Sequence, residues 1–362
     1  MEKTSKEKQK EILDNCMKAL QIPSPYSVWE PIEDYNYHLA NITKVRCMND
    51  LEASYVKGEI AKSDMFILRA IHCYGFASRN AVISLLNFWK QQEIKNANGG
   101  TMRALPSTDN LSNFWNRIRT LANKGAVYRH EFVVNPTYKS VYGEVDSREY
   151  RGILSVSSIA VSMYKTALQD NLIQFDSRLA FSSEDEIMRR IQISEIVGAF
   201  LQNSFINDVK FNVTVLCGRK RVALPAVMKA SYDGNGEAAC KLIFDALTLR
   251  TNTQIIKRES REKWAVDHLR EILSAMAEMD RAGSVISYVV LCLEDYTLMQ
   301  AIRDVLLKEA PDKIGRFLFT TGTIIDRNSC MTNPENLGKS FLEFGKDGRL
   351  LGATGYYFLD QK

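Results

Sequence analysis

The sequence has few residues that could hold a metal ion or form disulfides. Its seven cysteines are scattered over 362 residues without a Cys-x-x-Cys pair, and its four histidines are equally dispersed. Structural zinc needs cysteines and histidines at short, regular spacing. We therefore expect free thiols, no metal ion and no cofactor.

Long hydrophobic runs are also missing. No apolar stretch reaches the roughly 18 residues that a membrane-spanning helix needs. The N-terminus, MEKTSKEKQKEIL, is charged where a secretory signal would be apolar. These features predict a cytoplasmic protein with no membrane partner. Composition is ordinary for a globular chain, with 45% hydrophobic and 25% charged residues, and the length allows two or three domains.

The net formal charge of +4 is too small to indicate a nucleic-acid partner, but its distribution is informative. Between Ala61 and His130, ten Lys and Arg residues stand against three acids, an excess of +7. After Asp170, 25 basic residues balance 25 acids. A basic segment joined to a neutral one predicts phosphate binding by the basic segment.

The basic segment has the pattern of a winged helix-turn-helix module, expected from about Ser63 to Leu154. MFILRAIHCY predicts a first helix that Ser63 caps and Gly75 ends. Ser78 then caps a second helix through AVISLLNFW. These two helices and their short turn form the first half of the expected module.

A third helix, NLSNFWNRIRTLANK, is expected after a cap at Ser107 or Asp109. Its apolar residues recur at helical spacing and are expected to form one buried stripe: Leu111, Phe114, Ile118 and Leu121. AVYRHEFVV and RGILSVS predict the two strands on either side of a wing at 135–150, and SIAVSMYKTALQDN predicts a closing helix. In this module the third helix enters the major groove, while the wing reaches the phosphate backbone or the minor groove.

The exposed face of the third helix is the expected DNA-reading surface, because amide and guanidinium groups form paired hydrogen bonds with base edges. Its candidate residues are Asn110, Ser112, Asn113, Asn116, Arg117, Thr120 and Lys124. Further backbone contacts are expected from Arg79 on the second helix and from Lys139, Arg148 and Arg151 on the wing. Acids in the wing oppose phosphate, so a winged helix that binds only protein stays open as an alternative.

From about Ser182 the pattern changes to that of an α/β domain. Helices are expected at 184–206, 237–248, 261–280 and 296–309, and strands at 209–217, 221–230, SVISYVVLCL and GRFLFTT. The end of the chain predicts a hairpin that turns at Lys346-Asp347-Gly348. The expected divisions are an N-terminal helix (3–20) and linker over 1–60, the winged helix-turn-helix over 61–175, the α/β domain over 182–325 and a C-terminal hairpin extension over 326–362.

The string DGNGEAAC (233–240) matches the Gly-x-Gly-x-x-Ala fingerprint of dinucleotide sites. Asp233 and Glu237 would repel a pyrophosphate there, and no acid follows about twenty residues later on a strand. A plain glycine-rich turn is the favoured interpretation.

A nuclease site built from Lys229, Asp233, Glu237 and Lys241 is a further hypothesis that lacks the usual paired carboxylates. Trp264 and His268, one helical turn apart, are expected to pack in the core.

The chain resembles the replication-relaxation family of plasmid and conjugative-element proteins. The resemblance lies in ILRAIHCYGFASRNAVISLL, RIRTLANKGAVYR, VMKASYDGNGEAACKLIFDAL, SYVVLCLEDYTLMQAIRDVL and GRFLFTT. It implies a winged helix followed by a restriction-endonuclease-like domain. In the family, the third of these segments reads Glu-x-Asp where this chain has Lys229 and Ser231. Glu237 and Lys241 fit the family's later Glu and Lys. The departure at 229 and 231 nevertheless makes a metal-dependent nuclease less expected, and the resemblance then implies a degenerate form of the restriction-endonuclease-like fold.

The fold class expected is therefore α+β or α/β, with a winged helix-turn-helix followed by an α/β domain. The expected function is DNA binding in plasmid or mobile-element replication, copy control or transfer-linked regulation. Partners would be double-stranded DNA and a second copy of the chain or other replication and transfer proteins. We expect no catalytic residues; the alternatives are a metal-dependent nuclease or nicking enzyme and a protein-binding adaptor.

Overall fold

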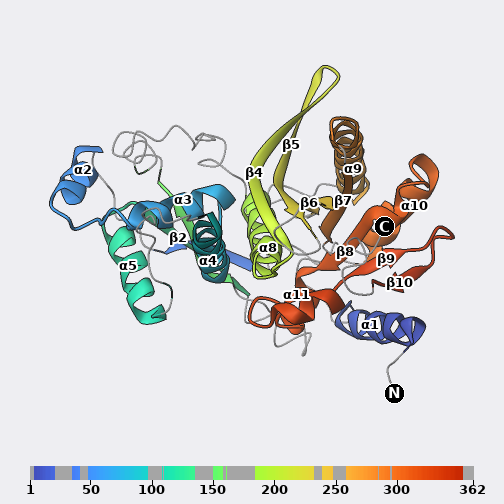
Figure 1. Cartoon of the computed structure of the whole chain (residues 1–362), viewed down its shortest axis with the longest axis horizontal. Helices are drawn as coiled ribbons and strands as arrows, with labels where there is room; N and C mark the ends of the chain where they lie inside the picture. The colour runs from blue at the N-terminus through green and yellow to red at the C-terminus, as the bar shows by residue number, and fades with distance from the viewer. Residues whose placement is uncertain are drawn as a thin grey trace. The chain divides into compact units, whose positions relative to one another are not determined.

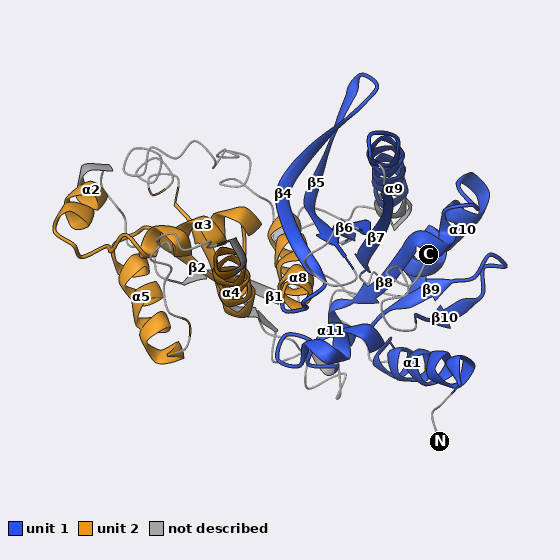
Figure 2. Ribbon diagram, in the orientation of Figure 1, with its two compact units in different colours: residues 1–34, 134–147, 202–362 blue, residues 35–133, 148–201 orange. Residues whose placement is uncertain are grey.

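The computed structural model describes residues 4–20, 35–40, 48–96, 108, 110–134, 150–157, 160, 184–231, 239–247, 258–283, 285–293 and 296–353. The chain divides into two compact units (Figure 2). Unit 1 comprises Met1–Asp34, Val134–Ser147 and Gln202–Lys362, and unit 2 comprises Tyr35–Val133 and Arg148–Leu201. Both contain helices and strands, so the expected mixed α and β class is confirmed.

Unit 2 contains a three-stranded sheet and a group of helices (Figure 1). Its elements are β1 (Tyr35–Ala40), α2 (Met48–Val56), α3 (Asp64–Tyr74), α4 (Arg79–Asn96), α5 (Leu111–Asn123), β2 (Val127–Val134), β3 (Tyr150–Val156) and α8 (Glu184–Phe200). The strand order is β1-β2-β3, with β2 and β3 antiparallel. Ala77, between α3 and α4, forms an isolated bridge with Leu154 of β3.

The turn between α3 and α4 follows the local signals in the sequence. Gly75 ends α3 at a φ of 81° and donates its backbone N–H to the Ile71 and His72 carbonyls. Glycine is favoured there because this left-handed conformation is costly for residues with a Cβ. The Ser78 hydroxyl accepts the Ala81 N–H at 3.3 Å and caps α4. The predicted helix pair is confirmed, although α4 continues to Asn96 and the Ser63 side chain forms no capping hydrogen bond at the start of α3.

Helix α5 begins at a different cap from the one expected. Asn110 is the N-cap, and its side-chain oxygen accepts the Asn113 N–H at 3.1 Å, so the expected caps Ser107 and Asp109 are wrong. Asn is as good a cap as Ser or Asp, and this one also lies next to the first helical residue. Phe114, Ile118 and Leu121 form a buried stripe as predicted, but Leu111, which was expected in it, is the first residue of α5 and is 51% exposed. Each such side chain contributes about 2 kcal/mol through burial.

An ion pair fixes the rotation of α5 against the start of α3. The Asp64 side chain is buried, and its carboxylate accepts hydrogen bonds from Nε of Arg117, at 3.0 Å, and from the neighbouring Nη2. Its Oδ2 also accepts the Ala61 N–H at 2.7 Å. Nη2 of Arg117 also donates to the Glu59 backbone carbonyl at 3.3 Å. A planar guanidinium that meets a carboxylate edge-on holds both partners in one orientation.

Unit 1 contains a seven-stranded mixed sheet with the order β10-β9-β8-β7-β6-β5-β4. Its elements are α1 (Ser5–Leu20), β4 (Ile206–Cys217), β5 (Lys220–Ala230), β6 (Cys240–Leu247), α9 (Arg258–Arg281), β7 (Ile286–Leu293), α10 (Tyr296–Glu309), η3 (Ile314–Arg316), β8 (Phe317–Thr321), α11 (Gly322–Arg327), η4 (Pro334–Lys339), β9 (Leu342–Phe344) and β10 (Leu350–Gly352). Strands β6, β7 and β8 are parallel, and the remaining neighbours are antiparallel.

Helices α9 and α10 supply most of the helical side chains in the core of unit 1. Leu269 and Ile272 of α9 and Leu306 of α10 belong to one buried cluster with Ile243 of β6 and Leu291 of β7. Strand β7 is almost wholly buried, which explains its unbroken apolar sequence. The predicted strand and the helix at 296–309 are therefore confirmed.

The segment from 237 to 248 is not a helix as predicted, because Cys240–Leu247 forms strand β6. A short apolar run such as CKLIFDAL has no periodicity that separates a buried strand from a buried helix. Strand β6 pairs antiparallel with β5. The intervening glycine-rich residues 232–238 lie outside the described ranges. A dinucleotide fingerprint requires a strand-to-helix turn, so that interpretation is wrong.

The first helix of unit 1 and its last described strand meet at the β10 edge of the sheet. Helix α1, the predicted N-terminal helix, packs against β10 and α11. Gly352 allows this approach, since a Cβ there would come within 2.7 Å of the Leu13 nitrogen. The predicted C-terminal hairpin is confirmed as β9 and β10, and β9 pairs with β8. The hairpin is thus part of the main sheet.

Six cysteines lie in the described parts of the chain, and all are free thiols. Burial raises the pKa of Cys16, Cys73 and Cys240 to about 12, so these thiols stay protonated at neutral pH. Within the same described ranges, no helix is both long and apolar enough to cross a membrane.

A first prediction concerns His130 in β2. Its Nε2 lies 2.7 Å from the Ser155 hydroxyl, and burial lowers its pKa to about 4 from an ordinary value of 6.5. Between these two values the unfolded chain binds a proton that the folded chain does not. Stability is therefore lost as the pH falls from about 6.5 to about 4, by about 3 kcal/mol in total.

Urea unfolding at about pH 7, 5.5 and 4.5 measures this loss. His130→Gln keeps a hydrogen-bond donor for Ser155 but does not titrate, so its unfolding free energy should fall less with pH than that of the unsubstituted chain. Equal pH dependence in both proteins would contradict the assignment.

A second prediction concerns the Asp64–Arg117 pair. Asp64→Ala should destabilise unit 2 by about 2 kcal/mol, because it leaves the guanidinium without its buried acceptor. A double-mutant cycle with Arg117→Ala should give a coupling energy of about 1–3 kcal/mol, measured by urea unfolding. Glu59→Gln, which removes the exposed partner of Lys124, is the control and should have a smaller effect. Coupling near zero would show that the pair does not hold α5.

Candidate functional site

Helix α5 presents a polar face opposite its buried stripe. The residues that are exposed on it are Ser112, Asn113, Asn116, Arg119 and Asn123. This face combines amide groups with one guanidinium and carries no acid. Amides and guanidinium groups each offer hydrogen-bond geometry that matches base edges.

Two cations expected on this face instead lie on the flank of α5 that contacts residues 59–64. Arg117 is bound to Asp64, and this hydrogen bond raises its pKa. The Lys124 ammonium lies 2.5 Å from Oε2 of Glu59, and its hydrogen bond lowers the pKa of that carboxyl. The charge of both cations is thus largely balanced within unit 2.

Two other candidate residues use their side chains within the helix. Asn110 caps the N-terminus of α5 through its side-chain oxygen. The Thr120 hydroxyl donates to the Asn116 carbonyl at 2.9 Å. These contacts stabilise α5 but leave fewer groups for a ligand.

Sequence reasoning missed Arg119 and Asn123 on the exposed face. Arg119 forms no ion pair with any other described residue, whereas Arg117 and Lys124 do. The signal was present in the helical period, since residues 112, 116, 119 and 123 recur at spacings of three and four away from the apolar stripe.

A second pair of cations, Arg79 and Arg129, includes one that stacks on Trp115 of α5. The Arg79 guanidinium at the start of α4 lies 5.0 Å from the Trp115 ring centroid, over its face. Burial lowers the pKa of Arg79, and repulsion from Arg129 of β2 lowers it further. Arg129 lies 3.8 Å from Glu131, and the Glu131 carboxylate is also the acid that stabilises the charge of Arg79. One carboxylate therefore balances two cations. Such a site favours an added anion.

The expected wing contacts cannot be placed in this arrangement. Lys139 and Arg148 lie outside the described ranges. Arg151 belongs to β3, and its side chain also lies outside them. These residues stay predictions from the sequence.

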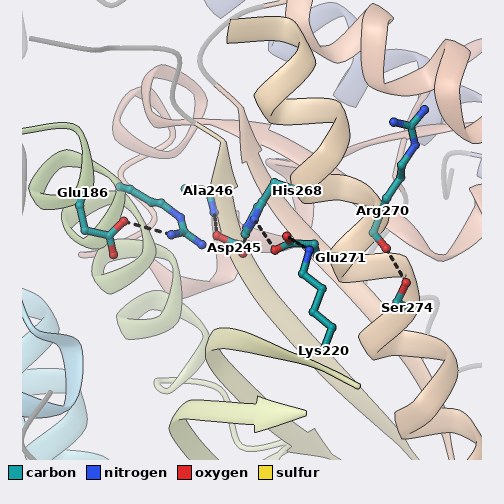
Figure 3. A network of polar contacts seen from close by, with 9 residues as sticks. Glu186, Lys220, Asp245, Ala246, His268, Arg270, Glu271 and Ser274 are labelled. Atoms are coloured by element: carbon teal, nitrogen blue, oxygen red, sulfur yellow. Dashed lines mark hydrogen bonds and ion pairs between the residues drawn. The ribbon is translucent and has the colours of Figure 1, made fainter. Parts of the chain in front are cut away.

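In unit 1 a polar chain of contacts connects strand β6, helix α9 and strand β5 (Figure 3). The Asp245 carboxylate is buried and lies 2.9 Å from Nε2 of His268, while its other oxygen accepts the Ala246 N–H at 2.7 Å. The Nδ1 atom of His268 lies 3.4 Å from Glu271, which pairs with Lys220 at 2.5 Å. Sequence reasoning missed Asp245, although an acid inside the apolar run CKLIFDAL is a visible signal.

This chain of contacts joins β6, α9 and β5. The two ring nitrogens of His268 face different carboxylates, Nε2 that of Asp245 and Nδ1 that of Glu271. Trp264 stacks on the ring with a centroid distance of 5.3 Å. It is 44% exposed, so its expected place in the core is wrong.

The two described residues of the suggested nuclease set, Lys229 and Lys241, are cross-strand neighbours on β5 and β6, but their side chains contact different groups. Lys229 lies 3.9 Å from Asp208, and Nζ of Lys241 donates to the Met279 carbonyl at 3.1 Å. Asp233 and Glu237 lie outside the described ranges. Among the residues that are described, no three His, Cys, Asp or Glu side chains are grouped so that they could hold a metal ion.

Comparisons with protein-family models, with curated proteins and with solved structures found no match to this chain.

Proposed function

We propose that unit 2 is a winged helix-turn-helix that binds double-stranded DNA, with α5 as the helix that enters the major groove. The order of elements supports this proposal. Three helices, α3, α4 and α5, precede the antiparallel strands β2 and β3. The bridge between Ala77 and Leu154 corresponds to the short strand that winged helices have between their first two helices.

The observation that carries the proposal is the exposed face of α5. Asn116 and Asn123 offer paired donor and acceptor groups, as adenine recognition requires. Arg119 has no ion-pair partner among the described residues and can form two hydrogen bonds with guanine or one with phosphate. The cations whose charge is already balanced, Arg117 and Lys124, hold the helix in position.

The Arg79 group supplies the contact to the DNA backbone. Arg79 is the first residue of α4, where the unpaired backbone N–H groups and the helix dipole also attract an anion. A phosphate between Arg79 and Arg129 would relieve the repulsion between them. The stack on Trp115 restricts the guanidinium to this position before DNA arrives.

The biological setting proposed is the one that the resemblance implies. The protein would act in the cytoplasm on the DNA of a plasmid or other mobile element, in replication, copy control or transfer-linked regulation. Unit 1 would then be a degenerate restriction-endonuclease-like domain that mediates contacts with a second copy of the chain or with replication and transfer proteins. Its mixed sheet with α9 and α10 packed on it is compatible with that fold.

The test begins with selection of bound fragments from a pool of random duplexes, using the full chain. A selected duplex should bind more tightly than a scrambled one, and its affinity should fall about tenfold or more between 50 and 200 mM salt. Arg119→Gln should weaken binding of the selected duplex by about tenfold in fluorescence anisotropy.

Lys124→Gln is the matched control, since it removes one positive charge from the same helix. Because Glu59 already balances that charge, we expect less than about a twofold loss of affinity. Equal losses in the two variants would contradict the assigned face. Failure to retain any duplex would contradict the function and favour a winged helix that binds only protein. Cleavage of supercoiled plasmid with Mg²⁺ would contradict a purely binding role.

A further inference from the structure

The charged residues of the hairpin formed by β4 and β5 are all basic between Val209 and Ser231. From Val209 to Ser231 it contains no Asp or Glu, and its five cations are Lys210, Arg219, Lys220, Arg221 and Lys229. Neighbouring acids pair with two of these, because Lys220 contacts Glu271 and Lys229 contacts Asp208. In the described part of the chain, Lys210, Arg219 and Arg221 have no ion pair. This hairpin is therefore a local basic feature in a half of the chain whose charges are balanced.

The outer part of the hairpin leaves the sheet as a two-stranded ribbon (Figure 1). Strand β5 pairs with β6 only from Ala226 to Ala230. The preceding residue, Pro225, has no N–H and so cannot extend that pairing. Opposite it in β4, Asn212 has a φ of 52°, which marks a kink in the strand. Residues 212–224, called the β4–β5 ribbon below, pair only with each other.

One face of the β4–β5 ribbon is held in place by helix α9. Val222 and Leu224 belong to the core cluster that includes α9, and Val213 and Val215 pack against it. The Lys220–Glu271 pair ties the tip to the same helix. An isolated two-stranded ribbon is only marginally stable in water, so this support fixes its shape.

The other face is exposed and carries no acid. Its cross-strand pairs are Thr214 with Ala223 and Leu216 with Arg221. The side chain of Leu216 is 63% exposed, which is unusual for a leucine. Gly218, with a φ of 61°, makes the tight turn that places Arg219 at the tip.

We propose that this exposed face of the β4–β5 ribbon is a second surface for double-stranded DNA. The major groove of DNA admits a two-stranded β-ribbon. The strand from Asn212 to Cys217 is about 17 Å long, so the ribbon is long enough to reach the floor of a groove that is about 8.5 Å deep. Ala223 and Thr214 allow close approach, and Leu216 suits the methyl group of thymine. Arg219 and Arg221 bind phosphates or guanine. The ribbon proposal rests on the proposed function of unit 2 in one respect, the choice of double-stranded DNA as the partner.

The test compares ribbon and α5 variants of the full chain on one duplex of about 40 base pairs, by fluorescence anisotropy at several salt concentrations. Arg219→Gln combined with Arg221→Gln should weaken binding by about tenfold or more and lower the slope of log affinity against log salt by about 2. Lys220→Gln is the matched control at the same tip and should change affinity less than about twofold, because Glu271 balances its charge. An unchanged thermal unfolding midpoint confirms that the variants fold.

The outcomes separate the two proposals. If Arg119→Gln weakens binding and the double ribbon variant does not, the ribbon proposal is wrong and the function of α5 stands. If only the ribbon variant weakens binding, the assigned face of α5 is wrong and the ribbon proposal stands. If the ribbon variant weakens binding to a single-stranded RNA of equal length but not to the duplex, the proposed partner is wrong. Absence of any duplex binding contradicts both proposals.

Discussion

Together with the buried stripe of α5, the ion pair between Asp64 and Arg117 sets which side of this helix faces solvent. Asp64 is buried at the start of α3, where an unpaired carboxylate would be costly, and Arg117 satisfies it with two nitrogens. Because the guanidinium is planar, this contact restricts rotation of α5 about its axis. The amide-rich side around Asn116 then lies away from the protein, together with Arg119. The proposed DNA contact depends on this orientation.

The same physical rule separates structural from available cations in both units. A cation next to a carboxylate has already gained its electrostatic stabilisation, and a second anion would have to compete for it. Lys124 and Lys220 belong to this class through Glu59 and Glu271. Arg119, Arg219 and Arg221 have no such partner in the described ranges. A local excess of basic residues therefore overstates the proposed DNA-binding surface, which consists of the cations without an ion-pair partner.

Local patterns predicted much of the fold. Helices α1, α3, α4, α5 and α10, the β4–β5 hairpin and the β9–β10 hairpin follow from caps, glycines and helical periodicity. Strand β6 was missed, because a short apolar run that is buried on both faces reads equally well as a helix. The candidate site was predicted only in part. The partners of Arg117 and Lys124 lie 53 and 65 residues away in sequence, and no local pattern reveals such pairs. Arg119 was predictable from helical period alone, once the buried stripe was known.

The most direct test of the account asks which side of α5 touches DNA. A photoreactive p-benzoylphenylalanine can replace Asn123 on the exposed face, or Glu59 on the segment that contacts the opposite flank. After irradiation with a selected duplex, the account predicts a covalent DNA adduct from position 123 and none from position 59. An adduct from position 59 without one from position 123 would contradict it.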